Sequence, residues 1–101
     1  MMSGQVNGDG AQSAGPPAVV VYWRPGCPYC IRLRMGLRRM NVASEELNIW
    51  SDPSAAAFVR SVNGGDETVP TVVVGATAMR NPTPREVKRE LERQAPGPEA
   101  K

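Results

Sequence analysis

The sequence contains no histidine and only two cysteines, Cys27 and Cys30, among its 101 residues. A structural zinc ion takes four protein ligands, most often cysteine and histidine. One copy of this chain therefore cannot complete such a zinc site, and we expect no metal site within it. A cluster shared between two chains is an alternative that the composition leaves open.

The chain is also short of aromatic residues, of long apolar stretches and of net charge. It has five aromatic residues and a net charge of +2, too little for a base-stacking, basic nucleic-acid surface. No apolar run approaches the ~18 residues that span a membrane, and no secretory signal is recognisable. We therefore expect a cytoplasmic protein that binds neither nucleic acid nor membrane. In that reducing compartment a Cys-x-x-Cys pair is redox-active or metal-binding rather than structural.

Composition divides the chain into one domain and two tails. Residues 1–17 are mostly glycine, serine, glutamine, asparagine and alanine without apolar periodicity, and residues 95–101 contain two prolines and a glycine. Both stretches are typical of disordered tails. The expected domain is 18–94, which leaves room for a single core.

Apolar periodicity and turn residues predict seven elements in the domain. The predicted strands cover residues 18–23, 43–49, 69–74 and 76–79. The predicted helices begin near Cys27, Pro53 and Pro84, and the last two have capping residues before a proline. The order is βαβ-α-ββα. A right-handed crossover makes the first two strands parallel, and the closing hairpin is antiparallel. The sequence thus predicts an α/β fold, a small mixed four-stranded sheet with helices on both faces.

The two cysteines lie at the junction between the first strand and the first helix, in the stretch Cys27-Pro28-Tyr29-Cys30. Free N–H groups and the helix dipole stabilise negative charge at a helix N-terminus, and Arg24 adds a nearby cation. A thiolate is the nucleophile of cysteine chemistry. We therefore expect Cys27 to be exposed at the tip and to attack, with Cys30 one turn in and partly covered. The pattern predicts thiol–disulfide exchange.

The rest of the first helix has an apolar stripe and a basic side. The stripe comprises Cys30, Leu33, Leu37 and Met40. The four arginines at positions 32, 34, 38 and 39 are expected to form a solvated face opposite that stripe.

The Cys-Pro-Tyr-Cys stretch at a helix start, followed by Thr68-Val69-Pro70 before a strand, resembles the glutaredoxins of the thioredoxin superfamily. The resemblance covers residues 18–94. It implies a thioredoxin-like fold and a thiol–disulfide oxidoreductase active in cell redox homeostasis, with Cys27 and Cys30 as catalytic residues. It also implies no tightly bound cofactor. Its partners would be disulfide-bonded proteins and a small thiol, and it would act as a monomer.

The same resemblance implies roles around the cysteines. Pro70 would be the family's cis-proline, and the main chain of Val69, next to Thr68, would pair with the substrate. Arg24 would be the basic residue that precedes the nucleophile. Tyr29 would shape access to Cys27.

Within the family, the chain is most similar to the mycoredoxins, which use mycothiol in place of glutathione. Glutathione-using members place an acidic pair after the hairpin to bind the ammonium, but residues 77–82 here contain no carboxylate. Arg80 would repel an ammonium, whereas Asn81 offers neutral hydrogen bonds to the amide and sugar hydroxyls of mycothiol. We therefore expect mycothiol, or else glutathione, as co-substrate. The alternatives are a thioredoxin-like electron donor to one reductase partner and a cluster-binding glutaredoxin.

Overall fold

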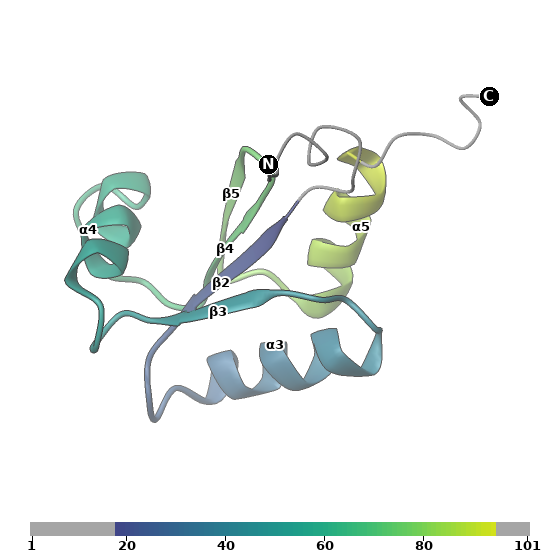
Figure 1. The fold of residues 1–101 in the computed structure, drawn as a ribbon, viewed down its shortest axis with the longest axis horizontal. Helices are drawn as coiled ribbons and strands as arrows, with labels where there is room; N and C mark the ends of the chain where they lie inside the picture. The colour runs from purple at the N-terminus through teal and green to yellow at the C-terminus, as the bar shows by residue number, and fades with distance from the viewer. Residues whose placement is uncertain (1–17, 95–101) are drawn as a thin grey trace, which may run out of the picture.

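Residues 18–94, which the computed structural model describes, form four strands and three helices (Figure 1). The strands are β2 (Val19–Trp23), β3 (Glu45–Asn48), β4 (Thr71–Val74) and β5 (Thr77–Arg80). The helices are α3 (Pro28–Arg39), α4 (Pro53–Val62) and α5 (Pro84–Gln94). The two expected tails, 1–17 and 95–101, lie outside the described residues, so the domain boundaries stay a prediction.

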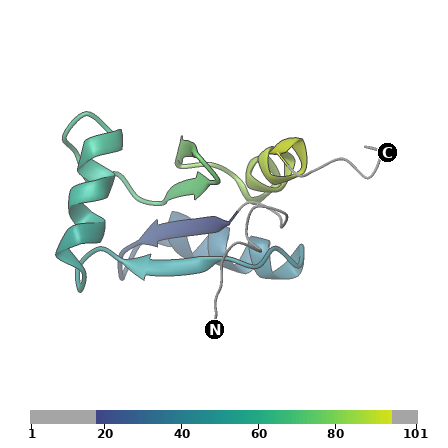
Figure 2. The same cartoon turned by 45° about the horizontal axis from the view of Figure 1, so that its top comes forward.

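The strands form one mixed sheet in the order β3-β2-β4-β5. β2 and β3 are parallel, with Val20 opposite Glu45, whereas β2–β4 and β4–β5 are antiparallel. Figure 2 shows β2 and β3 running side by side in the same direction, with α4 at their carboxyl ends. The predicted mixed four-stranded α/β architecture is confirmed.

Two apolar cores cover the two faces of the sheet, because side chains alternate along each strand. The larger core joins the sheet to α3 and α5. Its buried members are Val19, Val21, Leu33, Leu37, Val42, Val72, Val74 and Val87. The smaller core joins α4 to the opposite face through Ile49, Ala55, Ala56 and Val59, with Tyr22 stacked on Phe58 at 5.0 Å between ring centroids.

Each helix boundary has a local cause in the sequence. Asn41 adopts φ 59° after α3 and closes a Schellman motif, in which the Val42 N–H donates to Leu37 O at 2.9 Å. Asp52 caps α4 through the N–H groups of Ser54 and Ala55. Thr83 and Glu86 form a reciprocal capping box at the start of α5, with bonds of 2.9 and 3.1 Å.

The structure shortens β3 and shifts β5 relative to the predicted strands. β3 pairs only four residues with β2, so residues 43, 44 and 49 of the predicted strand fall outside it. β5 runs from Thr77 to Arg80, one residue later than predicted at each end, because Val74 and Thr77 are the first pair of the hairpin. None of the three helices in the described region is long and apolar enough to cross a membrane.

Candidate active site

Cys27 is the N-cap of α3, and its side chain turns toward the helix. The turn before it contains Gly26 at φ 78°, a conformation that glycine adopts without steric cost. The Sγ of Cys27 accepts a hydrogen bond from the Cys30 N–H at 3.3 Å. The two free thiols are therefore adjacent on the first turn, as the spacing predicts.

Burial of the two cysteines differs from the sequence-based expectation. Cys27 is only 4% exposed and Cys30 is fully buried. The expectation that Cys27 stands exposed at the tip is wrong, because its capping hydrogen bond holds Sγ inward, 3.9 Å from the carbonyl oxygen of Val69. Burial, and next a hydrogen bond with Cys27, raise the pKa of the Cys30 thiol to about 12, against an opposing effect of Arg24.

The loop opposite the cysteines carries Thr68, Val69 and Pro70. The Val69–Pro70 peptide bond is cis, as the family resemblance implies. Thr71 Oγ1 donates to Thr68 O at 2.7 Å, and the Asn81 N–H donates to Pro70 O at 2.8 Å. The loop is thus tied to β4 on one side and to the residue after β5 on the other. These bonds hold Val69 beside Cys27.

The side chains of Arg24 and Tyr29 lie at the surface around the cysteines. The guanidinium of Arg24 lies over the exposed ring of Trp50, 5.8 Å from its centroid. The side chain of Arg24 thus lies against an aromatic face, while a hydrogen bond from its backbone and then its charge oppose the rise in the Cys30 pKa. Tyr29 is exposed, and the guanidinium of Arg32 lies 5.6 Å from its ring centroid.

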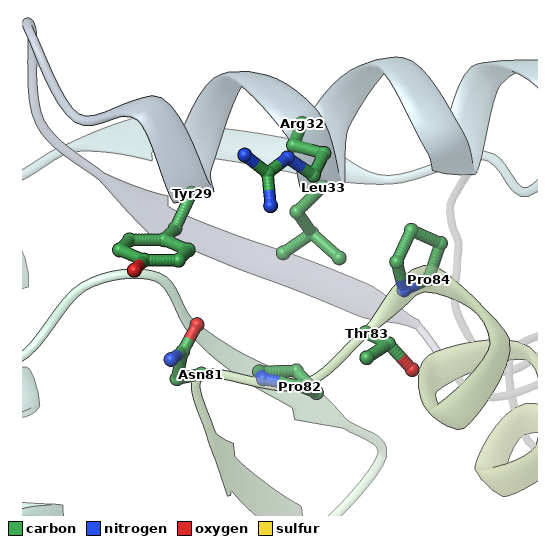
Figure 3. A pocket seen from close by; sticks show the side chains of 7 residues that line it. All are labelled: Tyr29, Arg32, Leu33, Asn81, Pro82, Thr83 and Pro84. Carbon is green, nitrogen blue, oxygen red and sulfur yellow. The ribbon is translucent and has the colours of Figure 1, made fainter.

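A pocket of about 220 Å³ opens between the first turns of α3 and the segment before α5 (Figure 3). It is lined by Tyr29, Arg32, Leu33, Asn81, Pro82, Thr83 and Pro84. Tyr29 and Asn81 point toward one another across it in Figure 3, and Asn81 adopts φ 50°, a conformation that asparagine tolerates. The lining offers hydroxyl and amide groups and one guanidinium, but no carboxylate.

Comparisons with known proteins agree with this geometry. The family model for glutaredoxin matches residues 19–78. The chain belongs to the glutaredoxin family. A glutaredoxin-like protein of Mycobacterium tuberculosis strain H37Rv is 41% identical over 75 residues, which cover 73% of this chain and 89% of the relative. Mycoredoxin 1 of Corynebacterium glutamicum is 35% identical, with 73% and 92% covered.

Solved structures show the same fold. The crystal structure of a glutaredoxin from Archaeoglobus fulgidus superimposes with a TM-score of 0.62 and 26% identity, covering 85% of this chain and 97% of that one. The fold is therefore thioredoxin-like. As a glutaredoxin, the chain is a thiol oxidoreductase that acts on disulfide-bonded proteins with a small thiol as co-substrate.

Arg80, expected from the sequence to repel an ammonium, is paired with a carboxylate in this glutaredoxin and does not line the pocket. Its Nη2 lies 3.1 Å from Asp66 Oδ2 and donates to Thr68 Oγ1 at 3.0 Å. Sequence reasoning missed Asp66, because it lies fourteen positions away and only the fold brings it to the end of β5. The pattern Asp66-x-Thr68 was the available signal, since an aspartate often accepts a hydrogen bond from the N–H two residues on.

On the basic face of α3, Arg32, Arg38 and Arg39 are exposed, as predicted, whereas Arg34 is half-buried. Arg34 lies over the ring of Trp23, 4.1 Å from its centroid, and Arg34 and Arg38 both pair with Glu46 at 3.0 and 3.2 Å. These two arginines therefore tie the helix to β3 and the end of β2. Within residues 18–94, no three histidine, cysteine or acidic side chains come together as a metal-binding group.

Proposed function

We propose that this glutaredoxin reduces mixed disulfides between proteins and mycothiol, with Cys27 as the nucleophile. The observation that carries the proposal is the pocket beside Tyr29, whose lining offers hydroxyl and amide groups and the guanidinium of Arg32, but no carboxylate that could bind an ammonium. Mycothiol has an amide and sugar hydroxyls but neither the ammonium nor the carboxylates of glutathione. Similarity to mycoredoxin 1 of Corynebacterium glutamicum supports the same co-substrate.

The proposed first step is an in-line exchange at the cysteine site. The Cys27 thiolate attacks the mycothiol sulfur of the mixed disulfide, the S–S bond between that sulfur and the sulfur of the target protein breaks, and the protein leaves as a thiolate that takes a proton from solvent. The N-cap position suits this role, because the Cys30 N–H already donates to Cys27 Sγ. The product is a disulfide between Cys27 and mycothiol.

Two routes can then release mycothiol. A second mycothiol thiolate attacks the sulfur of the bound mycothiol, forming mycothiol disulfide and restoring Cys27. Alternatively Cys30 attacks Cys27 and forms an internal disulfide. The raised pKa of Cys30, about 12, keeps its thiol protonated near neutral pH and favours the external route.

Residues around the exchange have proposed supporting roles. The main chain of Val69, before the cis-proline Pro70, aligns the disulfide substrate beside Cys27, and Thr68 fixes that loop. Tyr29 and Asn81 contact the small thiol across the pocket. Arg24 stabilises negative charge near the cysteines, because a hydrogen bond from its backbone and, to a smaller extent, the charge of its guanidinium oppose the rise in the Cys30 pKa.

The test compares turnover of a peptide–mycothiol and a peptide–glutathione mixed disulfide, each with its own thiol at matched concentration. An ammonium without its charge-assisted hydrogen bond loses about 1.5–3 kcal/mol, so we expect at least about tenfold preference for mycothiol. Asn81→Asp adds a carboxylate to the pocket and should narrow the preference by improving glutathione use. Asn41→Asp is the matched control, since Asn41 has the same backbone conformation at the other end of α3.

Equal use of both thiols by the unmodified protein would contradict the mycothiol assignment. The protein would then be a general glutaredoxin. Turnover of either disulfide by Cys27→Ser would contradict the role of Cys27 itself.

A further inference from the structure

Arg80, at the end of β5, reaches across to the loop that precedes the cis-proline. Its Nη2 donates to Thr68 Oγ1 at 3.0 Å and pairs with Asp66 Oδ2 at 3.1 Å. Asp66 in turn accepts the Thr68 N–H at 3.1 Å and also the Thr68 hydroxyl. Asp66, Thr68 and Arg80 therefore form one connected set of hydrogen bonds, called here the loop clamp.

The loop clamp and the backbone next to it hold Val69 from both sides. The residue before Val69 is held by the Arg80 side chain, and the residue after it by the Asn81 N–H, which donates to Pro70 O at 2.8 Å. Both attachments start from the same end of β5. Because Val69 O lies 3.9 Å from the buried Sγ of Cys27, a disulfide that reaches this sulfur must pass the main chain of residues 68–69.

The exposure of the clamp argues against a role in global stability. The side chains of Arg80 and Asp66 are 58% and 54% exposed, and exposed ion pairs add little to the free energy of unfolding. Hydrogen bonds from Thr68, followed by the charge and hydrogen bond of Arg80, lower the pKa of Asp66. The Asp66 carboxylate thus interacts with its own loop, through Thr68, and with Arg80.

We propose that Arg80 is a positioning residue, which acts through Thr68 and Asp66 to fix the main chain of residues 68–69 where the peptide part of a disulfide substrate binds. The inference rests on the proposed attack by Cys27. It gives Arg80 a role in the alignment of the protein substrate, separate from the choice between small thiols in the pocket, which Arg80 does not line.

The experiment measures single-turnover reaction of the pre-reduced protein with excess disulfide, so that no free small thiol takes part. One substrate is a peptide mixed disulfide, and the other is hydroxyethyl disulfide, which has no peptide groups to align. For Arg80→Gln we expect the half-saturating peptide concentration to rise about fivefold, with the maximal rate within about twofold. The reaction with hydroxyethyl disulfide should be unchanged, and Arg80→Lys should recover part of the loss.

Arg60→Gln is the matched control. Arg60 forms an ion pair with Glu67 of the same loop but makes no bond to Thr68. It should leave both reactions unchanged. A similar loss in Arg60→Gln, or an equal loss on both substrates in Arg80→Gln, would overturn the proposal in favour of a general effect on the loop.

A double-variant cycle tests whether Arg80 acts through Thr68. In Thr68→Val the added Arg80→Gln change should have a smaller effect than in the unmodified protein, because the hydroxyl that receives the guanidinium bond is already absent and only the contact of Arg80 with Asp66 remains. Losses that multiply would overturn the proposal. Cys27→Ser separates the two hypotheses: if it still reacts, the proposed function fails, whereas an inactive Cys27→Ser beside an unaffected Arg80→Gln contradicts the positioning role alone.

Discussion

Cys27 and Cys30 are three residues apart, yet their environments separate their chemistry. Cys27 sits at the N-cap, where its sulfur accepts a backbone N–H, while Cys30 is fully buried one turn further along. Burial favours the neutral thiol, and the hydrogen bond with Cys27 adds to that effect, so the pKa of Cys30 rises to about 12. Cys30 is therefore a protonated, shielded partner at neutral pH.

This difference predicts unequal alkylation of the two thiols. At pH 8 we expect iodoacetamide to modify Cys27 in the Cys30→Ser variant. In folded Cys27→Ser, Cys30 should react at least about tenfold more slowly, because its raised pKa lowers the thiolate fraction and its sulfur is the more deeply buried of the two. Mass spectrometry after timed quenching measures both rates. The same Cys27→Ser sample in denaturant is the control and should react quickly; rapid modification in the folded state would contradict the assignment.

At the scale of elements, the contact between α3 and α5 determines the position of Pro84, which lines the pocket beside Tyr29. Gly36 in α3 faces the ring of Pro84 at the start of α5, and a Cβ built on Gly36 would lie 2.3 Å from Pro84 Cγ. Real Cβ atoms do not approach this closely, and the proline ring has little freedom to move. The two helices therefore meet at a position that only glycine fits.

Gly36→Ala should destabilise the protein even though alanine favours helix. Overpacking costs about 1–3 kcal/mol, against about 1 kcal/mol gained from helix propensity, so a net loss of up to about 2 kcal/mol is expected. Urea unfolding followed by circular dichroism measures it. In the double variant with Pro84→Ala the loss should be smaller than the sum of the two single effects. A stabilised Gly36→Ala protein would mean that the helices separate without cost.

Patterns that depend on neighbouring residues were predictable, and contacts between distant residues were not. The order of the elements along the chain, the caps at Asp52 and Thr83 and the left-handed Asn41 follow from local periodicity and turn chemistry. The cysteine pair was identifiable from its place at the helix start.

The inward turn of Cys27 was not predictable from the sequence, because it depends on the loop that carries Val69. Sheet register determines which charges meet, as in the pair of Arg80 with Asp66 and that of Arg34 with Glu46. Spacing along the chain does not encode such pairs. The sequence therefore did not indicate that Arg80 and Arg34 form these specific contacts.

At the scale of the whole molecule, the end of α5 joins the last helix to the hairpin of the sheet. The amide nitrogen of Gln94 donates to Val74 O at 2.9 Å and to Thr77 Oγ1 at 3.1 Å. The same amide donates to Glu90 at 2.6 Å, and Glu90 also pairs with Arg93. The Glu90 carboxylate thus orients Gln94, whose bonds to the hairpin keep α5 over the larger core.

Acid should weaken this connection in a defined pH range. Hydrogen bonds from Arg93 and then Gln94 lower the pKa of Glu90 from 4.5 to about 2. A pKa that is lower in the folded state contributes stability above the unfolded value, and that stability is lost as pH falls through the folded value. The urea concentration at the unfolding midpoint should therefore decrease as the pH is lowered from 5 to 2. Glu90→Gln should unfold at a lower urea concentration at pH 7, and its midpoint should decrease less between pH 5 and pH 2. The midpoints of the two proteins should therefore converge near pH 2.

Glu92→Gln, an exposed change on the same helix, is the control and should follow the unmodified protein. Parallel curves for Glu90→Gln and the unmodified protein would show that Glu90 does not control the acid response.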